Sequence, residues 1–383
     1  MKTVLILVPC LGIGGQERIA INTANCLKND YNVKLVIFQK SDIEYDSPCE
    51  VIDLNLPARN NVFGKIWNQI HRIFRLARIR RQTKADVVLS LGTSANLTNV
   101  FSSMISSGKC ISSIHGFAEV KKNLLMNCIM KFSDKVICIA QAMREGLMSI
   151  YPKAKNVCVI ENGYDVETIF QKSKESTQDR LPTPYIVSMG RLEHVKGFDR
   201  LIKAFAVVRK TRTNLNLLLI GDGSLALELQ ELAKAEGVSD FVHFCGYKSN
   251  PYAYLRQAEM YVLSSRNEGF PNCLIEALCS ELPVVSMDCM SGPREILSHA
   301  YSSTRVIGIQ NEKYGILVEE ADAEEKNIEN LSCAILQALS QEAILATLKQ
   351  QAYARARTFG NEVYAKKIIS LIENVSTDTR RKN

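Results

Sequence analysis

Short apolar runs alternate with amphipathic segments along this chain of 383 residues, and this alternation is the feature that most limits how it can fold. The runs of the first half are apolar on both faces, which is typical of strands buried inside a parallel sheet. They are Val4–Val8, Val33–Phe38, Val87–Leu91, Cys110–Ile114 and Val136–Ile139. Helical periodicity occupies the segments between them, at Glu17–Leu27, Val62–Arg81 and Val120–Phe132. The order predicts an α/β fold with a parallel sheet wrapped by helices.

The pattern stops and then starts again. Gln171–Pro184 is polar, lacks periodicity and is typical of a linker. A second set of apolar runs follows it, at Tyr185–Met189, Leu215–Ile220, Phe241–Phe244, Met260–Leu263 and Val284–Met287. We therefore predict two Rossmann-like, doubly wound domains that face each other across a cleft. The expected bounds are 1–170 and 185–360, with a linker at 171–184 and a C-terminal helix and frayed tail at 361–383 that return to the first domain.

Composition excludes several other classes of protein. Apolar residues make up 46% and charged residues 23%, values of a globular protein with a full core. No apolar run approaches the roughly 18 residues of a membrane-spanning helix. The 12 cysteines are scattered and form no C-x-x-C pair, which argues against a zinc site and against a disulfide framework. The apolar start at Val4–Val8 is expected to be a first buried strand rather than a signal peptide.

The net charge of +7 is concentrated in the first half of the chain. Residues 1–170 hold 21 Lys and Arg against 14 Asp and Glu, whereas the remainder holds 26 of each sign. A negatively charged partner is therefore expected to meet the first half.

Two carboxylates flank a predicted helix start after the run Met260–Leu263. Glu268 lies on the loop and Glu276 on the second helical turn, with Phe270, Pro271 and Asn272 between them. Pro271 suits the first helical position, and the helix is expected to reach about Glu281. Free amides at a helix start attract anions, so this segment suits the diphosphate and hydroxyls of a sugar nucleotide. An exposed helix start with a capping glutamate explains the same residues equally well.

A second cluster follows the run Tyr185–Met189. Arg191 and Lys196 stand on a loop bounded by Gly190 and Gly197, and such a loop can hold a diphosphate. The alternative is a solvated surface loop.

Two further candidates lie in the first half. Gly14 and Gly15 follow the first strand and can bring backbone amides close to a phosphate or sugar, although a tight strand–helix turn is as good an explanation. His115 ends the strand Cys110–Ile114, where it is either structural or faces the predicted cleft.

Together these motifs resemble those of the family 4 retaining glycosyltransferases with the GT-B fold. The resemblance rests on Arg191 and Lys196, the Glu268/Glu276 pair, the Gly14-Gly15 loop, and Asn162-Gly163-Tyr164-Asp165 at the domain junction. It spans nearly the whole chain, with the motifs in the same order. The family usually has Val where this chain has Tyr164.

The resemblance implies a role for each matching residue. Arg191 and Lys196 would hold the donor diphosphate, and Glu276 the ribose hydroxyls. Glu268 would contact the donor sugar with the amides near Phe270, Pro271 and Asn272, and His115 would sit beside the sugar ring. Gly14 and Gly15 would approach the phosphate or the acceptor. The first domain would then bind the acceptor and the second the nucleotide sugar.

The resemblance also implies a mechanism. Such enzymes need no metal and no cofactor besides the nucleotide-sugar donor, so fixed positive groups and helix amides must stabilise the leaving diphosphate. Retention is explained by front-face attack, in which the leaving phosphate takes the acceptor's proton. Glu268 as a covalent nucleophile is the alternative.

Ser291–Leu297 resembles the branch that builds bacterial lipopolysaccharide, O-antigen and other surface polysaccharides. This implies a UDP-linked donor, such as a UDP-N-acetylhexosamine, and a lipid-linked glycan or lipopolysaccharide acceptor. A sugar-nucleotide epimerase and a non-catalytic sugar-nucleotide-binding protein are the alternatives.

One basic stretch suggests a membrane partner. No acid occurs between Asp53 and Asp86, and the segment carries eight basic residues: Arg59, Lys65, Arg72, Arg75, Arg78, Arg80, Arg81 and Lys84. Apolar residues recur among them at helical spacing: Phe63, Ile66, Trp67, Ile70, Ile73, Phe74 and Ala77. We expect a peripheral protein on the cytoplasmic face of the inner membrane that uses stretch 59–84, and no nucleic-acid partner. Alternatively, the apolar side chains pack on the sheet and the arginines only solvate the helix.

Overall fold

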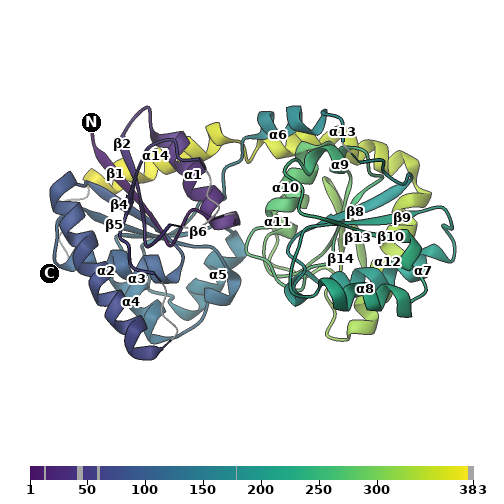
Figure 1. The fold of residues 1–383 in the computed structure, drawn as a ribbon, viewed down its shortest axis with the longest axis horizontal. Helices are drawn as coiled ribbons and strands as arrows, with labels where there is room; N and C mark the ends of the chain where they lie inside the picture. The colour runs from purple at the N-terminus through teal and green to yellow at the C-terminus, as the bar shows by residue number, and fades with distance from the viewer. Residues whose placement is uncertain (13, 41–45, 58–60, 178, 378–383) are drawn as a thin grey trace. The chain divides into compact units, whose positions relative to one another are not determined.

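A computed structural model of the protein describes residues 1–12, 14–40, 46–57, 61–177 and 179–377. They form two compact units, one made of 1–164 and 360–383, the other of 165–359. The division falls earlier than the expected bounds, because α6 (Val166–Ser173) belongs to the second unit and occupies the start of the expected linker. Helix α14 (Asn361–Thr377) belongs to the first unit, where it contacts α1 (Gly15–Leu27) (Figure 1).

The first unit is built on a parallel sheet of seven strands in the order β3-β2-β1-β4-β5-β6-β7. The strands are β1 (Thr3–Val8), β2 (Asn32–Ile37), β3 (Glu50–Asp53), β4 (Val87–Leu91), β5 (Lys109–Ile114), β6 (Lys135–Cys138) and β7 (Val157–Val159). The five strands expected from the apolar runs are confirmed. The two that the apolar pattern missed, β3 and β7, are short, only partly buried edge strands.

Side chains of β1 show why this sheet needs helices on both faces. Val4, Ile6 and Val8 pack in one cluster with residues of α1 and α14. Leu5 and Leu7 point the other way and pack with Leu76 and Ala95. The helices besides α1 and α14 are α2 (Val62–Thr83), α3 (Thr93–Met104), α4 (Leu124–Phe132) and α5 (Gln141–Ile150).

The second unit repeats the plan with the order β10-β9-β8-β11-β12-β14-β13. Its strands are β8 (Tyr185–Met189), β9 (Asn216–Ile220), β10 (Val242–Gly246), β11 (Tyr261–Leu263), β12 (Val284–Met287), β13 (Ile309–Glu312) and β14 (Gly315–Val318). The five expected runs are confirmed as strands. The missed pair, β13 and β14, forms an antiparallel edge, and β13 is mostly polar.

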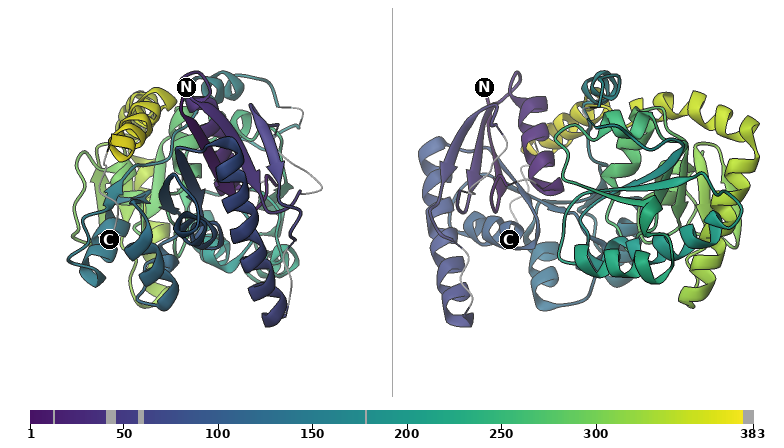
Figure 2. Two further views of the ribbon diagram at one scale, coloured as in Figure 1. Left: turned by 90° about the vertical axis from the view of Figure 1, so that its left-hand side faces the viewer. Right: turned by 45° about the vertical axis from the view of Figure 1, so that its right-hand side comes forward.

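Helices of the second unit cover both faces of its sheet (Figure 2). They are α6, α7 (Phe198–Arg209), α8 (Ala226–Ala235), α9 (Tyr252–Arg256), α10 (Asn272–Cys279), α11 (Pro293–Leu297), α12 (Glu324–Ser340) and α13 (Glu342–Arg357).

Strand order reverses once in each unit, between β1 and β4 in the first and between β8 and β11 in the second. Connections leave such a pair of strands in opposite directions, and this opens a crevice at the strands' carboxyl ends. The loops after β8 and after β11 are therefore the natural ligand-binding loops of the second unit.

Candidate functional site

The loops after β8 and β11 are joined at their backbones. The Arg266 amide donates to the Val195 carbonyl at 2.8 Å, and the Ser264 hydroxyl donates to the Lys196 carbonyl at 3.0 Å. Gly197 has φ of +63°, and a Cβ atom on it would lie 2.1 Å from the Ser264 carbonyl oxygen. Only glycine lets the loops approach so closely.

This contact brings Lys196 and Glu268 together. The Lys196 Nζ lies 2.7 Å from Glu268 Oε1, and the Ser265 hydroxyl donates to the same oxygen at 2.7 Å. The side chains of Lys196 and Glu268 are only 20% and 10% exposed. Burial alone would lower the pKa of Lys196, but the charge and hydrogen bond of Glu268, together with the nearby Cys273 and Cys289, outweigh it, so the Lys196 pKa is raised. Lys196 is therefore a fixed positive charge at the switch point.

Glu276 lies on the second turn of α10 and is 4% exposed. It neighbours Cys273, whose pKa rises to about 12 because the thiol is buried and because Glu268 and Glu276 add negative charge, with Lys196 acting in the opposite direction. Lys196, Glu268 and Glu276 thus all lie near enough to this thiol to influence its pKa. Their common neighbourhood was expected from the sequence, whereas Ser265 and Cys273 were missed.

The start of α10 lies between the two glutamates. Pro271 is the N-cap rather than the first helical residue, and the helix ends at Cys279 rather than near Glu281. The helix starts at Asn272, so its first-turn amides and the positive end of its dipole follow Glu268 by four residues in the chain. Phe270 is buried and packs edge-on against Phe359, with ring centroids 5.6 Å apart, which fixes the loop that leads into the helix.

Arg191 does not join Lys196. Its guanidinium pairs with Glu193 at 3.0 Å, and its side chain is 75% exposed. It stands on the same loop as Lys196. Because its side chain is exposed, it can change conformation and contact a bound anion.

A network of charges beneath the two loops holds them in place. Arg266 donates to both carboxylate oxygens of Asp199, at 2.7 and 2.6 Å, and to the His194 carbonyl at 2.8 Å. Arg200, 2% exposed, pairs with Glu320 and Glu324 at 2.7 and 2.6 Å. This network gives Lys196 and Glu268 a rigid support.

In the first unit, Gly14 and Gly15 form the start of α1, after β1. Gly14 is the extended N-cap residue and Gly15 the first helical residue. A Cβ on Gly14 would lie 2.3 Å from a carboxylate oxygen of Glu17, so the glycine leaves room for that side chain. Ile13, between the strand and this turn, lies outside the described residues.

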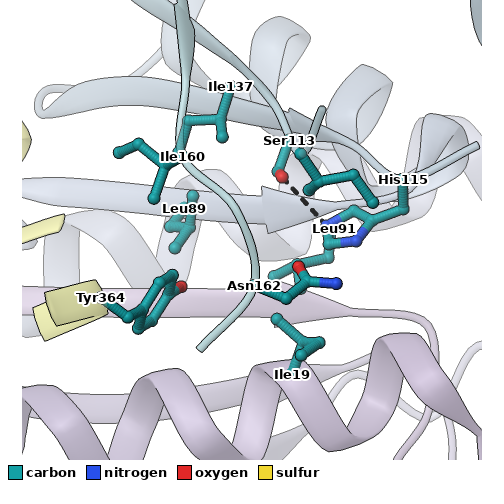
Figure 3. A pocket seen from close by; sticks show the side chains of 10 residues that line it. Ile19, Leu89, Leu91, Ser113, His115, Ile137, Ile160, Asn162 and Tyr364 are labelled. Carbon is teal, nitrogen blue, oxygen red and sulfur yellow. Dashed lines mark hydrogen bonds between the residues drawn. The ribbon is translucent and has the colours of Figure 1, made fainter. Parts of the chain in front are cut away.

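His115 follows β5 and lines a cavity of about 10 Å³, room for one water molecule, together with Asn162 and Tyr364 (Figure 3). Its Nε2 lies 2.9 Å from the Ser113 hydroxyl oxygen. Burial lowers the pKa of His115 to about 4, so the ring is neutral at pH 7. Glu119, which sequence analysis missed, accepts the His115 and Gly116 amides at 3.2 and 3.1 Å and holds this loop.

Family models match both units. The model of glycosyl transferases group 1 matches residues 167–355, and the model of glycosyltransferase family 4 matches residues 13–168. The chain belongs to family 4 of the GT-B glycosyltransferases.

Two relatives of this glycosyltransferase align over most of their own length. An N-acetylgalactosamine-N,N'-diacetylbacillosaminyl-diphospho-undecaprenol 4-alpha-N-acetylgalactosaminyltransferase of Campylobacter jejuni is 25% identical, over 94% of this chain and 96% of its own. A lipopolysaccharide 1,6-galactosyltransferase of Salmonella typhimurium is 24% identical, over 78% of this chain and 83% of its own.

Solved structures share the fold of the glycosyltransferase. The lipopolysaccharide outer core galactosyltransferase WaaB in its apo form gives a TM-score of 0.73 at 20% identity, over 98% of this chain and 99% of its own. Alr3699/HepE of Anabaena in complex with UDP and glucose gives 0.75 at 18% identity, over 98% and 100%. The expected GT-B fold is confirmed. The chain is a glycosyltransferase, so the two alternatives, a sugar-nucleotide epimerase and a non-catalytic binding protein, no longer hold.

Two absences hold for the residues of the glycosyltransferase that the structure describes, 1–12, 14–40, 46–57, 61–177 and 179–377. Within those ranges no three His, Cys, Asp or Glu side chains are grouped as metal ligands would be. No single helix there has the length and apolar content to cross a bilayer. Helices α12 and α13 reach that length and apolar content only when taken together, and the chain bends by 93° between them.

Proposed function

We propose that this glycosyltransferase retains the anomeric configuration while it moves a sugar, such as an N-acetylhexosamine, from a UDP-sugar to a hydroxyl of a lipid-linked glycan. Its place would be the synthesis of a bacterial surface polysaccharide or lipopolysaccharide, at the cytoplasmic face of the inner membrane. The observation that carries the proposal is the buried Lys196–Glu268 pair at the switch point of the second unit, next to the start of α10.

Donor binding follows from the charges at this point. A diphosphate bound beside Lys196 would contact its ammonium group, which stays charged because its pKa is raised. The first-turn amides of α10 would add hydrogen-bond donors. Arg191, exposed on the same loop, can exchange Glu193 for a phosphate oxygen. Glu276, deeper on α10, is suited to accept hydrogen bonds from the ribose hydroxyls.

In the second unit, Glu268 is suited to recognise the donor sugar. One oxygen of Glu268 already accepts from Lys196 and Ser265, so the carboxylate is held as a hydrogen-bond acceptor for sugar hydroxyls rather than as a nucleophile. The neutral His115 can donate or accept a hydrogen bond but carries no charge at pH 7.

The chemical step that suits this arrangement is front-face substitution. The bond from the anomeric carbon to the diphosphate oxygen breaks, the acceptor oxygen bonds to that carbon on the same face, and its proton passes to the departing phosphate. Lys196, Arg191 and the α10 amides offset the charge that develops on the diphosphate, so the proposal needs no metal and no cofactor.

Names of relatives support the choice of substrates. HepE was crystallised with UDP and glucose, and the pneumococcal O-GlcNAc transferase GtfA with UDP and GlcNAc. The Campylobacter relative is named for a diphospho-undecaprenol acceptor. We therefore propose that the second unit binds the UDP-sugar and the first unit the lipid-linked acceptor.

The test is turnover with defined substrates. A panel of nucleotide sugars is screened by thermal shift, and the stabilising donors are incubated with lipid-linked glycans and analysed by mass spectrometry. We expect UDP-sugars to stabilise the protein and one of them to extend the glycan with retention, read from the anomeric coupling constant of the product. Stabilisation by another nucleotide class, or an inverted product, would refute the proposal.

A further inference from the structure

Helix α2 in the first unit turns three polar side chains, those of Asn68, Arg72 and Arg80, toward the protein. The buried residues of this helix are Gly64, Asn68, Arg72, Leu76, Ala77 and Arg80. The Arg72 Nη2 donates to the Leu56 carbonyl at 2.6 Å, and its guanidinium lies 4.0 Å from the ring centroid of Phe38. Arg80 is fully buried, and one of its guanidinium nitrogens donates to the Ser107 carbonyl at 3.2 Å.

This orientation overturns the simple packing alternative. Among the apolar residues expected to pack on the sheet, Ala77 is buried and Ile73 half-buried. It also removes Arg72 and Arg80 from the basic surface, because both are buried, whereas Arg75 stays exposed although it donates to the Leu54 carbonyl. Arg59 lies outside the described residues.

The outer side of α2 carries an apolar stripe, defined here as Phe63, Ile66, Trp67, Ile70 and Phe74. These side chains are 86%, 55%, 57%, 44% and 62% exposed. They recur at spacings of three and four residues, so they follow one line along the helix. A monomeric protein in water rarely leaves so many large apolar side chains exposed in one row. We therefore expect another molecule to cover the apolar stripe.

The charge of α2 indicates what kind of molecule covers the apolar stripe. Helix α2 contains no Asp or Glu, and Lys65, Arg78 and Arg81 are exposed on it. A second copy of the same helix would bring like charges together, whereas an anionic surface would attract them. An apolar face flanked by basic side chains is the pattern of a helix that lies flat in a lipid interface.

We infer that α2 lies in the interface of an anionic bilayer, with the apolar stripe inserted among the acyl chains and Arg78 and Arg81 at the headgroups. The docking surface is independent of the donor site, since every residue of it lies in the first unit and the Lys196–Glu268 pair in the second. The inference would also explain how the proposed enzyme reaches a lipid-linked acceptor.

Trp67, the only tryptophan of the chain, reports directly on the stripe. The full-length protein is titrated with vesicles of equal parts phosphatidylglycerol and phosphatidylcholine, and with vesicles of phosphatidylcholine alone. We expect a blue shift of Trp67 emission and sedimentation with the anionic vesicles, weakened by salt. Neutral vesicles should give little of either.

Two sets of variants test the apolar stripe and the basic side chains of α2 separately. The triple variant Phe63→Ser, Ile66→Ser, Phe74→Ser should lower vesicle partitioning by at least about tenfold, because three inserted side chains are lost. Its matched control replaces three exposed apolar residues of the second unit, Val207, Leu227 and Ile307, by Ser. Arg78→Glu with Arg81→Glu should weaken binding to anionic vesicles only, compared with Lys210→Glu with Lys349→Glu in the second unit.

Three results would overturn the inference: equal partitioning of the triple variant and its control, equal binding to neutral and anionic vesicles, or a lipid-free blue shift of Trp67 that grows with protein concentration. The last result would show that a second copy covers the stripe. UDP titration of the same variants keeps this outcome separate from the proposed function, because UDP affinity should not change in any of them.

Discussion

Lys196 and Glu268 are 72 positions apart in the chain, yet the Nζ of one lies 2.7 Å from the Oε1 of the other. The pair exists because β8 and β11 are neighbours at the point where the strand order reverses, so the loops that leave them meet. Its burial makes each partner sensitive to the loss of the other.

Replacing Lys196 should therefore remove donor binding. In Lys196→Ala we expect the Kd for UDP to rise at least about tenfold, as for the loss of one charge-assisted hydrogen bond, and transfer to disappear. Isothermal titration with UDP measures the first effect. Lys210→Ala, an exposed lysine at the end of α7, is the matched control. Unchanged UDP affinity in Lys196→Ala would refute the donor site.

Glu276→Ala tests the proposed ribose contact. The variant should bind UDP about tenfold more weakly, because a ribose hydroxyl loses its carboxylate acceptor. Its affinity for 2′-deoxy-UDP should fall less, since that ligand already lacks one hydroxyl. Titration of both ligands into Glu276→Ala, and into the exposed control Glu228→Ala, gives the comparison. Equal losses for the two ligands would place the 2′-hydroxyl away from Glu276.

Gly197 allows a direct test of the contact between the loops. A Cβ there would lie 2.1 Å from the Ser264 carbonyl oxygen at a φ of +63°, so Gly197→Ala should destabilise the protein by about 3 kcal/mol or more. Gly237 has a similar φ of +70° but nothing within 4 Å of the added Cβ. Gly237→Ala should cost only about 1–2 kcal/mol of backbone strain. Urea unfolding of both variants decides, and equal losses would contradict the close approach.

His115 should make the protein less stable in acid. Its pKa in the folded protein is about 4, below the ordinary value of 6.5, so the unfolded chain binds a proton first as the pH falls. The stabilisation is complete above pH 6.5 and declines toward pH 4, by roughly 2 kcal/mol between pH 7 and pH 5. Urea unfolding at the two pH values should show a smaller difference in His115→Gln than in the unaltered protein. An unchanged difference would mean that the His115 pKa is not lowered.

Removal of metal ions should leave transfer intact. Because Lys196, Arg191 and the amides of α10 are proposed to offset the leaving charge, EDTA should not change the rate measured with a UDP-sugar and a lipid-linked acceptor. A rate that falls with EDTA and returns with Mg²⁺ or Mn²⁺ would contradict this mechanism.

Much of the donor-site prediction depended on local signals. Apolar runs such as Tyr185–Met189 are long enough to identify buried strands, and Arg191, Lys196 and Glu268 follow such strands directly. Polar or short edge strands such as β13 gave no comparable signal, because an edge strand needs no continuous apolar run.

The amino-acid sequence by itself determined the two α/β units, the central strands of their sheets and the neighbourhood of the glutamate pair, because local residue types show which strands are buried on both faces and which loops follow them. Only the tertiary structure decided which side of α2 faces water. Helical spacing places Phe63, Trp67 and Phe74 on one line but cannot say whether that line meets the sheet. The carbonyl oxygen of Leu56, brought close by the fold, accepts from the buried Arg72, so the Arg72 side of α2 packs on the protein and the apolar stripe stays exposed.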